Sequence, residues 1–534
     1  MKKLFVIYVL FIFASNVCAQ NTTDVEIDFG QTVLASRFQP GVTHTQNSID
    51  PWNDPEAAAD AKILLKNSTR FQNQHIMGWG ALNPWPDSTV VNPENWNWNS
   101  LDNRMQLIRE TKGETVITLC GAPTWMHTPS KNGETDWGKI ETAPTPDHFD
   151  DFARLCAVVA RRYPDVMYYQ VWNELKGFWH AGLNRWRYED YTRMYNMIYD
   201  SLKAVNPNIK IGGPYPVVST YSAQKSFTSD LGGEYGNFDK RPLDVIEYWL
   251  EHKKGADFIA IDGKTKNKDE IWNVDAFQSA DKFADIIGWI RQQSHGGADL
   301  DIWWSEWYAY SRPEDPSENI DFHNALMASS LIKCIKAGSS AVLIWQPEGD
   351  KDGFSFPLGL WTSTDNAGGG KPTPFYDTYS HFKEHFSEGA EIVKTSFNSE
   401  DINTIATKDK VLMVNQGNTV TEATINGEQP VLLNPYEVKL MDAIATFSHS
   451  AKESEIKVFY NAQNSRLNIR NLNTKRESIK YKIFDVTGKM LVNGEVTEGT
   501  GCHINLNGFR EGIYHYRISV GNTKLNDRFI ITKY

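Results

Sequence analysis

The sequence has few cysteines and lacks the cysteine and histidine patterns that mark structural metal sites. Five cysteines occur in 534 residues, and there is no CxxC or HExxH motif. Cys18 lies in the N-terminal apolar segment, whereas Cys120, Cys156, Cys334 and Cys502 stand singly in the rest of the chain. Because three of these four fall in expected core elements, we predict buried free thiols and no disulfide framework. We expect neither a metal nor another cofactor.

An excess of positive charge and a long apolar run are also missing. The formal net charge is -12, which argues against a nucleic acid partner. Beyond the N-terminus no apolar run is long enough to cross a membrane. The content of 40% hydrophobic and 22% charged residues is that of a globular chain. A chain of 534 residues exceeds one ordinary core, so we expect two or three domains.

The N-terminus has the pattern of a secretory signal peptide. Lys2 and Lys3 precede the apolar run Leu4 to Ala14, and Val17-Cys18-Ala19 places small residues at a cleavage point after Ala19. We therefore assign residues 1–19 to a signal peptide and expect a secreted or cell-surface protein. Lipidation at Cys18 is the alternative, but Ser15-Asn16-Val17 lacks the leucine and small residues that usually precede a lipidated cysteine.

Strand-like and helix-like segments alternate from about residue 37 to residue 386. The predicted strands are Phe38–His44, Phe71–Trp79, Thr115–Leu119, Met167–Trp172, Ile209–Gly212, Phe258–Ile261, Ile302–Glu306 and Ala341–Trp345. The predicted helices are Pro55–Leu65, Leu101–Glu110, Asp147–Arg162, Tyr188–Val205, Leu243–His252, Phe277–Gln292, Phe322–Ala337 and Phe375–Phe386. Such alternation predicts parallel strands with helical crossovers, and eight repeats predict a (β/α)8 barrel over residues 20–388. An open doubly wound sheet is the alternative, but the glycine-rich phosphate turn common after its first strand is missing.

The remainder of the chain is β-rich. Short strand-like runs and the hairpin signal Asn426-Gly427 predict a small β-domain over residues 389–446. Residues 447–456 are polar and linker-like, and residues 457–534 alternate as in a compact β-sandwich.

The last segment resembles the C-terminal sorting domain of the type IX secretion system of Bacteroidetes. The resemblance is carried by residues 484–489 (FDVTGK), 504–506 (INL), 512–514 (GIY) and 528–533 (RFIITK). Residues 458–462 (VFYNA) depart from the usual Tyr-Pro-Asn-Pro opening. The resemblance implies that the type IX machinery is a partner, and that the chain crosses the periplasm and outer membrane and loses this domain. An ordinary β-sandwich accessory module is the alternative.

Two of the predicted strands end in a glutamate. Glu174 follows the fourth strand as Trp172-Asn173-Glu174, and Glu306 ends the seventh as Trp304-Ser305-Glu306. In a parallel barrel the carboxyl ends of all strands face one rim, so these carboxylates can meet across it. Two facing carboxylates are the equipment of glycoside hydrolysis; about 5–5.5 Å between them predicts retention of configuration and about 6.5–9.5 Å predicts inversion.

The barrel segment resembles clan A glycoside hydrolases, most closely glycoside hydrolase family 39. The resemblance runs from Val171-Trp172-Asn173-Glu174 to Ile211-Gly212-Gly213-Pro214, with Gly121-Ala122-Pro123 and Ser305-Glu306-Trp307 elsewhere. It implies that Glu174 is the acid/base and Glu306 the nucleophile of a retaining enzyme. Two departures put the sugar in doubt: Leu175 stands where the family has proline, and Asp262-Gly263-Lys264 replaces a His-Tyr type ending of the sixth strand.

Other strand ends supply candidate sugar contacts. Asn173 is placed to bind a sugar 2-hydroxyl, and Trp345 to form the floor of the site. The remaining candidates are His44, His75, Trp79, Trp125 and Lys264.

We therefore predict a secreted retaining glycosidase that acts on a plant or algal polysaccharide or its oligosaccharides. A catalytically silent carbohydrate-binding barrel is the first alternative, although binding alone does not need two carboxylates. An endo-acting clan A enzyme on a sulfated or uronic glycan is the second, since Lys264, Arg185 and Arg187 would suit an anionic sugar.

Overall fold

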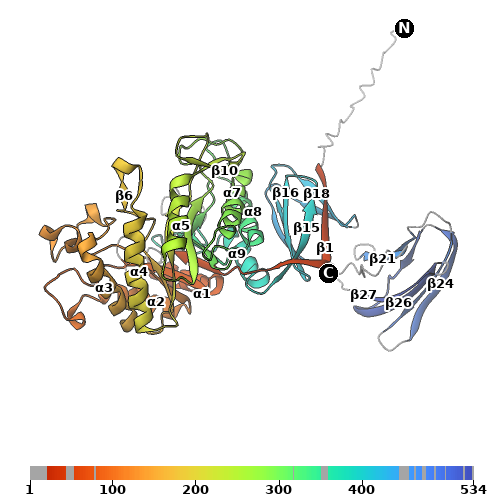
Figure 1. Cartoon of the computed structure of the whole chain (residues 1–534). Coiled ribbons are helices and arrows are strands. Elements are labelled where there is room, and N and C mark those ends of the chain that lie inside the picture. Colours follow the sequence, from red (N-terminus) through yellow and green to blue (C-terminus); the bar gives the residue numbers. More distant parts are fainter. Residues whose placement is uncertain are drawn as a thin grey trace, which may run out of the picture. The chain divides into compact units, whose positions relative to one another are not determined.

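The chain forms two compact units, residues 1–442 and 443–534, which are described separately (Figure 1). The computed structural model describes residues 21–43, 53–76, 80–316, 318–349, 359–427, 429–443, 456–461, 465–471, 477–485, 489–499, 501–520 and 523–531. The expected signal peptide, His44 and Trp79 lie outside these residues. Within them, no helix has the length and apolar character needed to span a bilayer.

The core of the first unit is a closed barrel of eight parallel strands that follow one another in chain order. Each of the eight predicted strands overlaps one of them, so the predicted (β/α)8 fold is confirmed. The barrel strands are β2 (Pro40–Thr43), β3 (Phe71–His75), β4 (Glu114–Leu119), β5 (Tyr168–Val171), β8 (Lys210–Val217), β12 (Phe258–Lys264), β13 (Asp301–Tyr308) and β14 (Ala341–Trp345).

Helices lie in the crossovers between these strands. They are α1 (Pro55–Ser68), α2 (Asn99–Glu110), α3 (Phe149–Arg162), α4 (Tyr188–Val205), α5 (Lys240–His252), α6 (Ala276–Ser279), α7 (Asp281–Arg291), α8 (Ile320–Ala337) and α9 (Pro374–His385). Local chemistry sets their ends: the Asp54 carboxylate accepts from the amides of the first turn of α1, and Gly338 ends α8 in the left-handed region. The single helix predicted over Phe277–Gln292 is wrong, because the chain breaks at Ala280, next to a hydrogen bond from the Ser279 hydroxyl to the Thr265 carbonyl.

The barrel interior is built in layers. At the amino ends of the strands, Phe71, Phe258 and Trp303 stack with ring centroids 4.1 and 4.6 Å apart. The next layer is polar. Its hydrogen bonds run around the interior through five buried side chains: Thr43, Asn73, Thr118, Gln170 and Ser305. Thr43 closes the circuit by donating to the Ser305 carbonyl. This polar layer fixes the strands directly beneath the rim formed by their carboxyl ends.

Two loops at the carboxyl ends of the strands carry small sheets of their own. The loop after β5 holds β6 (Trp179–His180) and β7 (Arg185–Trp186), and the loop after β8 holds β9 (Thr220–Tyr221), β10 (Thr228–Gly233) and β11 (Gly236–Asp239). Figure 1 shows β6 and β10 at the same end of the barrel. Short 3-10 turns occur at Pro93–Asn95, Thr124–Met126, Pro129–Lys131, Trp137–Lys139, Pro146–His148 and Ala181–Leu183.

A β-domain of two sheets packs on the barrel. One sheet has the order β15-β1-β18-β19 and the other β16-β17-β20. The strands are β1 (Asn21–Ala35), β15 (Glu391–Phe397), β16 (Ile402–Ala406), β17 (Lys410–Asn415), β18 (Thr421–Ile425), β19 (Gln429–Leu433) and β20 (Val438–Asp442). Asn403 Nδ2 donates to the Ser329 hydroxyl of α8 at 2.8 Å, which joins the domain to the barrel.

The N-terminal strand β1 belongs to this β-domain, whereas the sequence analysis assigned residues 20–388 to the barrel. It pairs antiparallel with β15 and parallel with β18. Asn426 Oδ1 accepts a hydrogen bond from the Ile27 amide at 2.8 Å, although the two residues are 399 positions apart in the sequence. Such distant partners leave no local pattern in the strand itself, so the sequence could not place it.

The second unit is a β-sandwich with its own core. Its sheets have the orders β21-β22-β25 and β24-β23-β26-β27. The strands are β21 (Ile456–Asn461), β22 (Arg466–Asn471), β23 (Glu477–Phe484), β24 (Met490–Gly499), β25 (Gly501–Asn505), β26 (Gly512–Val520) and β27 (Thr523–Ile531). Leu467, Ile483, Ile504, Ile518 and Phe529 are among the residues buried between them. The predicted compact all-β module is confirmed.

Three of the four later cysteines, Cys120, Cys156 and Cys334, are buried free thiols as predicted. Cys502 is also free, but it is half-buried, because it lies in β25 of the small second unit.

Candidate active site

A pocket of about 140 Å³ opens at the carboxyl ends of the barrel strands. We call it the rim pocket. Its lining residues come from four strands and the segment after β5: Asn173, Glu174, Lys176, Val217, Asp262, Lys264, Glu306, Tyr308 and Trp345. Oxygens of Glu174, Asp262 and Glu306 lie within 4.8 Å of one another. Three carboxyl groups, one from the turn after β5 and two from the strands β12 and β13, therefore converge in one small space.

The backbone turns sharply where β5 ends. Trp172, Glu174 and Leu175 all have positive φ, at 71°, 48° and 50°. Side chains other than glycine rarely adopt this region, and such strain is concentrated at functional sites. The turn also accounts for Leu175, because a proline ring fixes φ near -65° and cannot adopt 50°. The replacement of the family's proline by Leu175 is therefore compatible with the positive φ at this position, in the same turn that positions Glu174.

Glu306 is buried and receives two hydrogen bonds on one oxygen. The Tyr215 hydroxyl donates to Glu306 Oε1 at 2.9 Å, and Asn173 Nδ2 donates to the same atom at 3.3 Å. His75 Nε2 lies 3.8 Å from it. Donors aimed at a carboxylate oxygen stabilise the ionised form.

Glu174 is more accessible and lies beside a cation. Lys176 Nζ is 2.8 Å from Glu174 Oε2 and 2.7 Å from Glu141 Oε1. On its other side, Glu174 shares a hydrogen bond with the Asp262 carboxyl group. Such a bond between two carboxyl groups requires a proton on one of them.

The environments move the pKa values of the three carboxyl groups in different directions. Burial, followed by the charges of Glu174 and Glu306, raises the pKa of Asp262 well above its usual value. Burial also raises the pKa of Glu174, but the hydrogen bond from Asp262 and the ammonium of Lys176 outweigh it, so the pKa is lowered. Burial and the charge of Glu174 raise the pKa of Glu306 to about 8, against the effect of Tyr215 and Asn173. Burial and neighbouring charge therefore favour the protonated forms of Asp262 and Glu306.

The structure brings most of the predicted site residues together. Asn173, Glu174, Lys264, Glu306 and Trp345 line the rim pocket, with the Trp345 ring 5.8 Å from that of Tyr308. His75 is a buried neighbour of Glu306, behind the pocket lining.

Trp125 does not line the rim pocket. Its indole nitrogen donates to the Trp85 carbonyl at 3.1 Å, and its ring packs at 5.0 Å against that of Trp85. The loop after β4 folds the side chain into an aromatic cluster with Trp96 and Trp98, which the strand count could not foresee.

Three site residues were not predicted. Tyr215 was missed because the predicted strand ended at Gly212, whereas β8 continues to Val217 and carries the tyrosine into the site. Asp262 was noted only as a departure from the family. Lys176 stands two positions after Glu174, and that proximity was the one available signal.

The three carboxyl groups also have the spacing of a metal-ligand set. The ammonium of Lys176 already pairs with Glu174, and Asp262 shares its proton with the same glutamate. A largely buried cluster compensated by a cation and a proton differs from an open shell of ionised ligands. We assign no metal to it.

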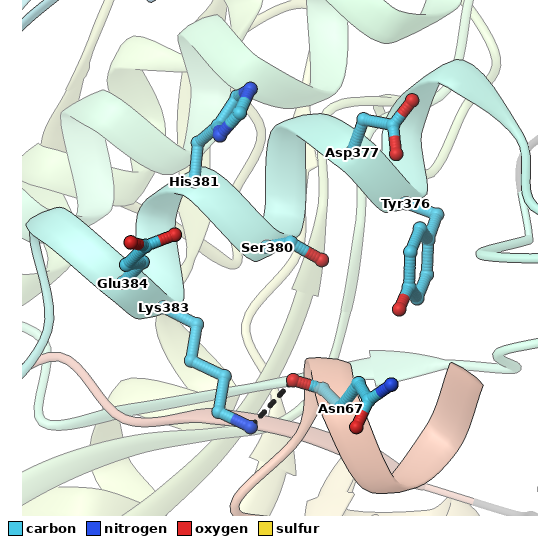
Figure 2. A pocket seen from close by; sticks show the side chains of 7 residues that line it. All are labelled: Asn67, Tyr376, Asp377, Ser380, His381, Lys383 and Glu384. Carbon is cyan, nitrogen blue, oxygen red and sulfur yellow. Dashed lines mark hydrogen bonds between the residues drawn. The ribbon is translucent and has the colours of Figure 1, made fainter. Parts of the chain in front are cut away.

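A second and larger hollow, of about 730 Å³, lies between α1 and α9 (Figure 2). We call it the helical hollow. It is lined by Asn67, Tyr376, Asp377, Ser380, His381, Lys383 and Glu384. Lys383 Nζ donates across it to the Asn67 carbonyl at 2.6 Å. Its size alone does not make it a candidate for catalysis.

Comparison with known proteins separates the two units. Residues 457–532 match the secretion system C-terminal sorting domain. The sorting-domain resemblance is thereby confirmed, and the second unit marks the chain for export. No curated protein sequence matches the chain.

Solved structures similar to the chain share the barrel fold. SrfJ from Salmonella typhimurium has a TM-score of 0.52 at 11% identity, covering 80% of this chain and 93% of its own. A glucosidase from Croceicoccus marinus has a TM-score of 0.50 at 12% identity, covering 90% and 96%. A BuGH86 protein in complex with neoagarooctaose has a TM-score of 0.50 at 12% identity, covering 93% and 96%. At these identities the similarity shows the fold.

Proposed function

We propose that the barrel is a retaining glycoside hydrolase in which Glu306 is the nucleophile and Glu174 the acid/base. The observation that carries this proposal is the convergence of these two carboxyl groups from β5 and β13, with oxygens within 4.8 Å. Carboxyl groups this close favour direct attack on a sugar carbon, whereas inversion through a water uses a separation of about 6.5–9.5 Å.

The contacts of each glutamate support its role. Glu306 has Tyr215 and Asn173 as fixed donors, which stabilise the ionised form that a nucleophile needs. Glu174 stands at the more open side of the pocket, where a leaving group can depart. A proton on Glu174 removes the nearest negative charge from Glu306, so protonating the acid helps to ionise the nucleophile.

The reaction follows in two displacements. Glu306 attacks the anomeric carbon while Glu174 gives its proton to the glycosidic oxygen, and a glycosyl ester forms as the leaving group departs. Glu174, now ionised, takes a proton from water, whose oxygen attacks the same carbon and releases Glu306. Asn173 and Trp345 both line the rim pocket, and in this proposal Asn173 binds the sugar 2-hydroxyl and Trp345 forms the floor under the ring.

Azide rescue of alanine variants tests the two roles. With a 2,4-dinitrophenyl glycoside, Glu174→Ala should leave a trapped glycosyl enzyme, which azide converts to a product of retained configuration. Glu306→Ala should give a glycosyl azide of inverted configuration. NMR of the products distinguishes these outcomes. Binding without turnover by the wild-type protein would instead favour the silent carbohydrate-binding barrel.

An anionic glycan is the second candidate substrate. Lys264 lines the pocket, and no carboxylate of the described residues lies within 4.0 Å of its ammonium. The two loop arginines that also suggested an anionic sugar pair with Glu189 and Asp190, which weakens their part in that hypothesis. A panel of neutral, sulfated and uronic oligosaccharides, with neoagarooctaose included, should show which class is turned over.

We further infer that the sorting domain directs the chain through the type IX machinery, across the periplasm and outer membrane. Support comes from the family match over residues 457–532. A chain truncated after residue 456 should accumulate inside the cell, whereas the full chain should be released or displayed at the surface.

A further inference from the structure

Asp262 is a third carboxyl group in the rim pocket, and the proposed double displacement does not use it. It lies on β12 in register with Glu306 of the neighbouring strand. Between Ile261 and Asp262 the pairing shifts by one residue on β13. The shift brings the Asp262 side chain beside the catalytic glutamates, and the residue is only 6% exposed.

The partners of Asp262 show which carboxyl group carries a proton. An oxygen of its side chain lies within 4.8 Å of one of Glu174, and the two carboxyl groups share a hydrogen bond. Glu174 in turn has the ammonium of Lys176 at 2.8 Å. Lys264 acts on Asp262 only from beyond ion-pair distance. A buried carboxyl group with no ammonium at ion-pair distance is more easily neutral than one paired with an ammonium group, so the shared proton rests on Asp262.

Lys176 creates a difficulty that this arrangement resolves. A general acid must keep its proton at the working pH, but a cation at 2.8 Å favours the ionised form of Glu174. Alone with Lys176, Glu174 would reach the substrate as a carboxylate. A neighbouring carboxyl group that retains a proton supplies what Glu174 lacks.

We propose that Asp262 and Glu174 share a single proton, and that Asp262 is a positioning residue that keeps this proton in the site while Lys176 pairs with Glu174. The inference rests on the proposed function. When a substrate enters, the O–H bond of Asp262 breaks and an O–H bond forms on Glu174. That bond breaks as the proton passes to the glycosidic oxygen and the bond from this oxygen to the anomeric carbon is cleaved. The proton taken from water in the second displacement restores the pair.

The other groups around Asp262 do not compete for this proton. The charged and titratable side chains facing it are Glu174, Glu306, Lys264, Tyr215, Tyr308 and Tyr310. Burial raises the pKa of each of the three tyrosines, so they stay neutral. Glu306 acts on Asp262 through its charge alone, whereas Glu174 shares a hydrogen bond with it. Exchange is therefore confined to Asp262 and Glu174, which titrate as a pair.

Asp262→Asn tests the proposal, because asparagine keeps the size and a donor but has no proton to share. Turnover of a phenyl glycoside, whose leaving group needs an acid, should fall about 10- to 100-fold. Turnover of the 2,4-dinitrophenyl glycoside of the same sugar should change less than about three-fold, since that leaving group departs without a proton. The basic limb of the pH profile with the phenyl glycoside should move to lower pH.

Lys176→Gln provides an independent check of the proposal, because it changes a partly exposed side chain that pairs with Glu174. Removing the cation should move the basic limb to higher pH, and the double variant Asp262→Asn/Lys176→Gln should lie between the two single variants. Equal losses on both glycosides, with the limb unmoved, would mean that Asp262 is only structural and overturn the proposal. An unaffected Asp262→Asn variant overturns it as well. Both results leave the proposed function intact, which fails if Glu306→Ala retains turnover or if the wild-type protein binds a glycan without turnover.

Discussion

The rim pocket and the helical hollow contain similar side chains but assemble them differently. Both have carboxylates, a lysine and a tyrosine. Six of the seven residues of the helical hollow come from the single helix α9, as Figure 2 shows. Those of the rim pocket come from β8, β12, β13, β14 and the turn after β5. Side chains on one helix diverge, whereas those at the ends of barrel strands converge.

The comparison explains why we propose the smaller space as the site of chemistry. Among the described residues, the helical hollow holds no cluster of three or more Asp, Glu, His or Cys side chains, and Lys383 donates to backbone carbonyls. In the rim pocket three carboxyl groups are close enough to change one another's protonation. We therefore attribute the expected reactivity to the convergence and burial of the carboxyl groups, and not to the volume of the pocket or the types of residue that line it.

The largest expected contrast is between matched glutamates. Glu306→Gln should lower turnover of an aryl glycoside by at least about 10³-fold, because the amide cannot form the glycosyl ester. Glu384→Gln in the helical hollow should leave turnover within about two-fold of wild type. Steady-state kinetics on both purified proteins checks this. A comparable loss in Glu384→Gln would mean that the helical hollow takes part in the reaction.

Matched tyrosines should show a smaller contrast. Tyr215→Phe removes a hydroxyl that donates to Glu306 at 2.9 Å. Because a hydrogen bond to a charged group contributes about 1.5–3 kcal/mol, turnover should fall roughly 10- to 100-fold. The acid limb of the pH profile should move to higher pH, since the carboxylate loses a stabilising donor. Tyr376→Phe is the control and should be silent. Wild-type kinetics in Tyr215→Phe would remove Tyr215 from the site.

The smallest effect concerns stability. The pKa of Glu306 is raised from 4.5 to about 8 in the folded protein, so folding favours the protonated form. Its contribution to stability is complete below pH 4.5 and is lost as pH rises towards 8. Glu306→Gln removes this loss, so its Tm should exceed that of wild type by about 1–4 °C at pH 8 and by less at pH 5. Scanning calorimetry at the two pH values checks the sign, with Glu384→Gln expected to show no such dependence.

Much of the fold and part of the site followed from the sequence. Strand counting put Glu174 and Glu306 on one rim, because the barrel's connectivity fixes which strand ends meet. In the sequence, Asp262 was noted only as a difference from the family at the end of the sixth strand. Its part in the site became visible only from its proximity to Glu174 in the structure. The place of Tyr215 in the site could not be predicted, because it depends on how far β8 extends beyond Gly212 and Gly213. Trp125 was misplaced because loop conformations at the rim are set by packing between loops.

The pairing of β1 bears on the order in which the chain can fold. Thr23 bonds Asn398 across 375 positions, and β1 has strands from the far end of the unit on both sides. The strand that is synthesised first therefore stays without its partners until residues 391–425 have appeared. Throughout that time it is an unpaired edge, open to association with other chains. A chain cut at residue 388 would leave β1 permanently without its partners β15 and β18. The later strands of the β-domain therefore protect this strand from association with other chains.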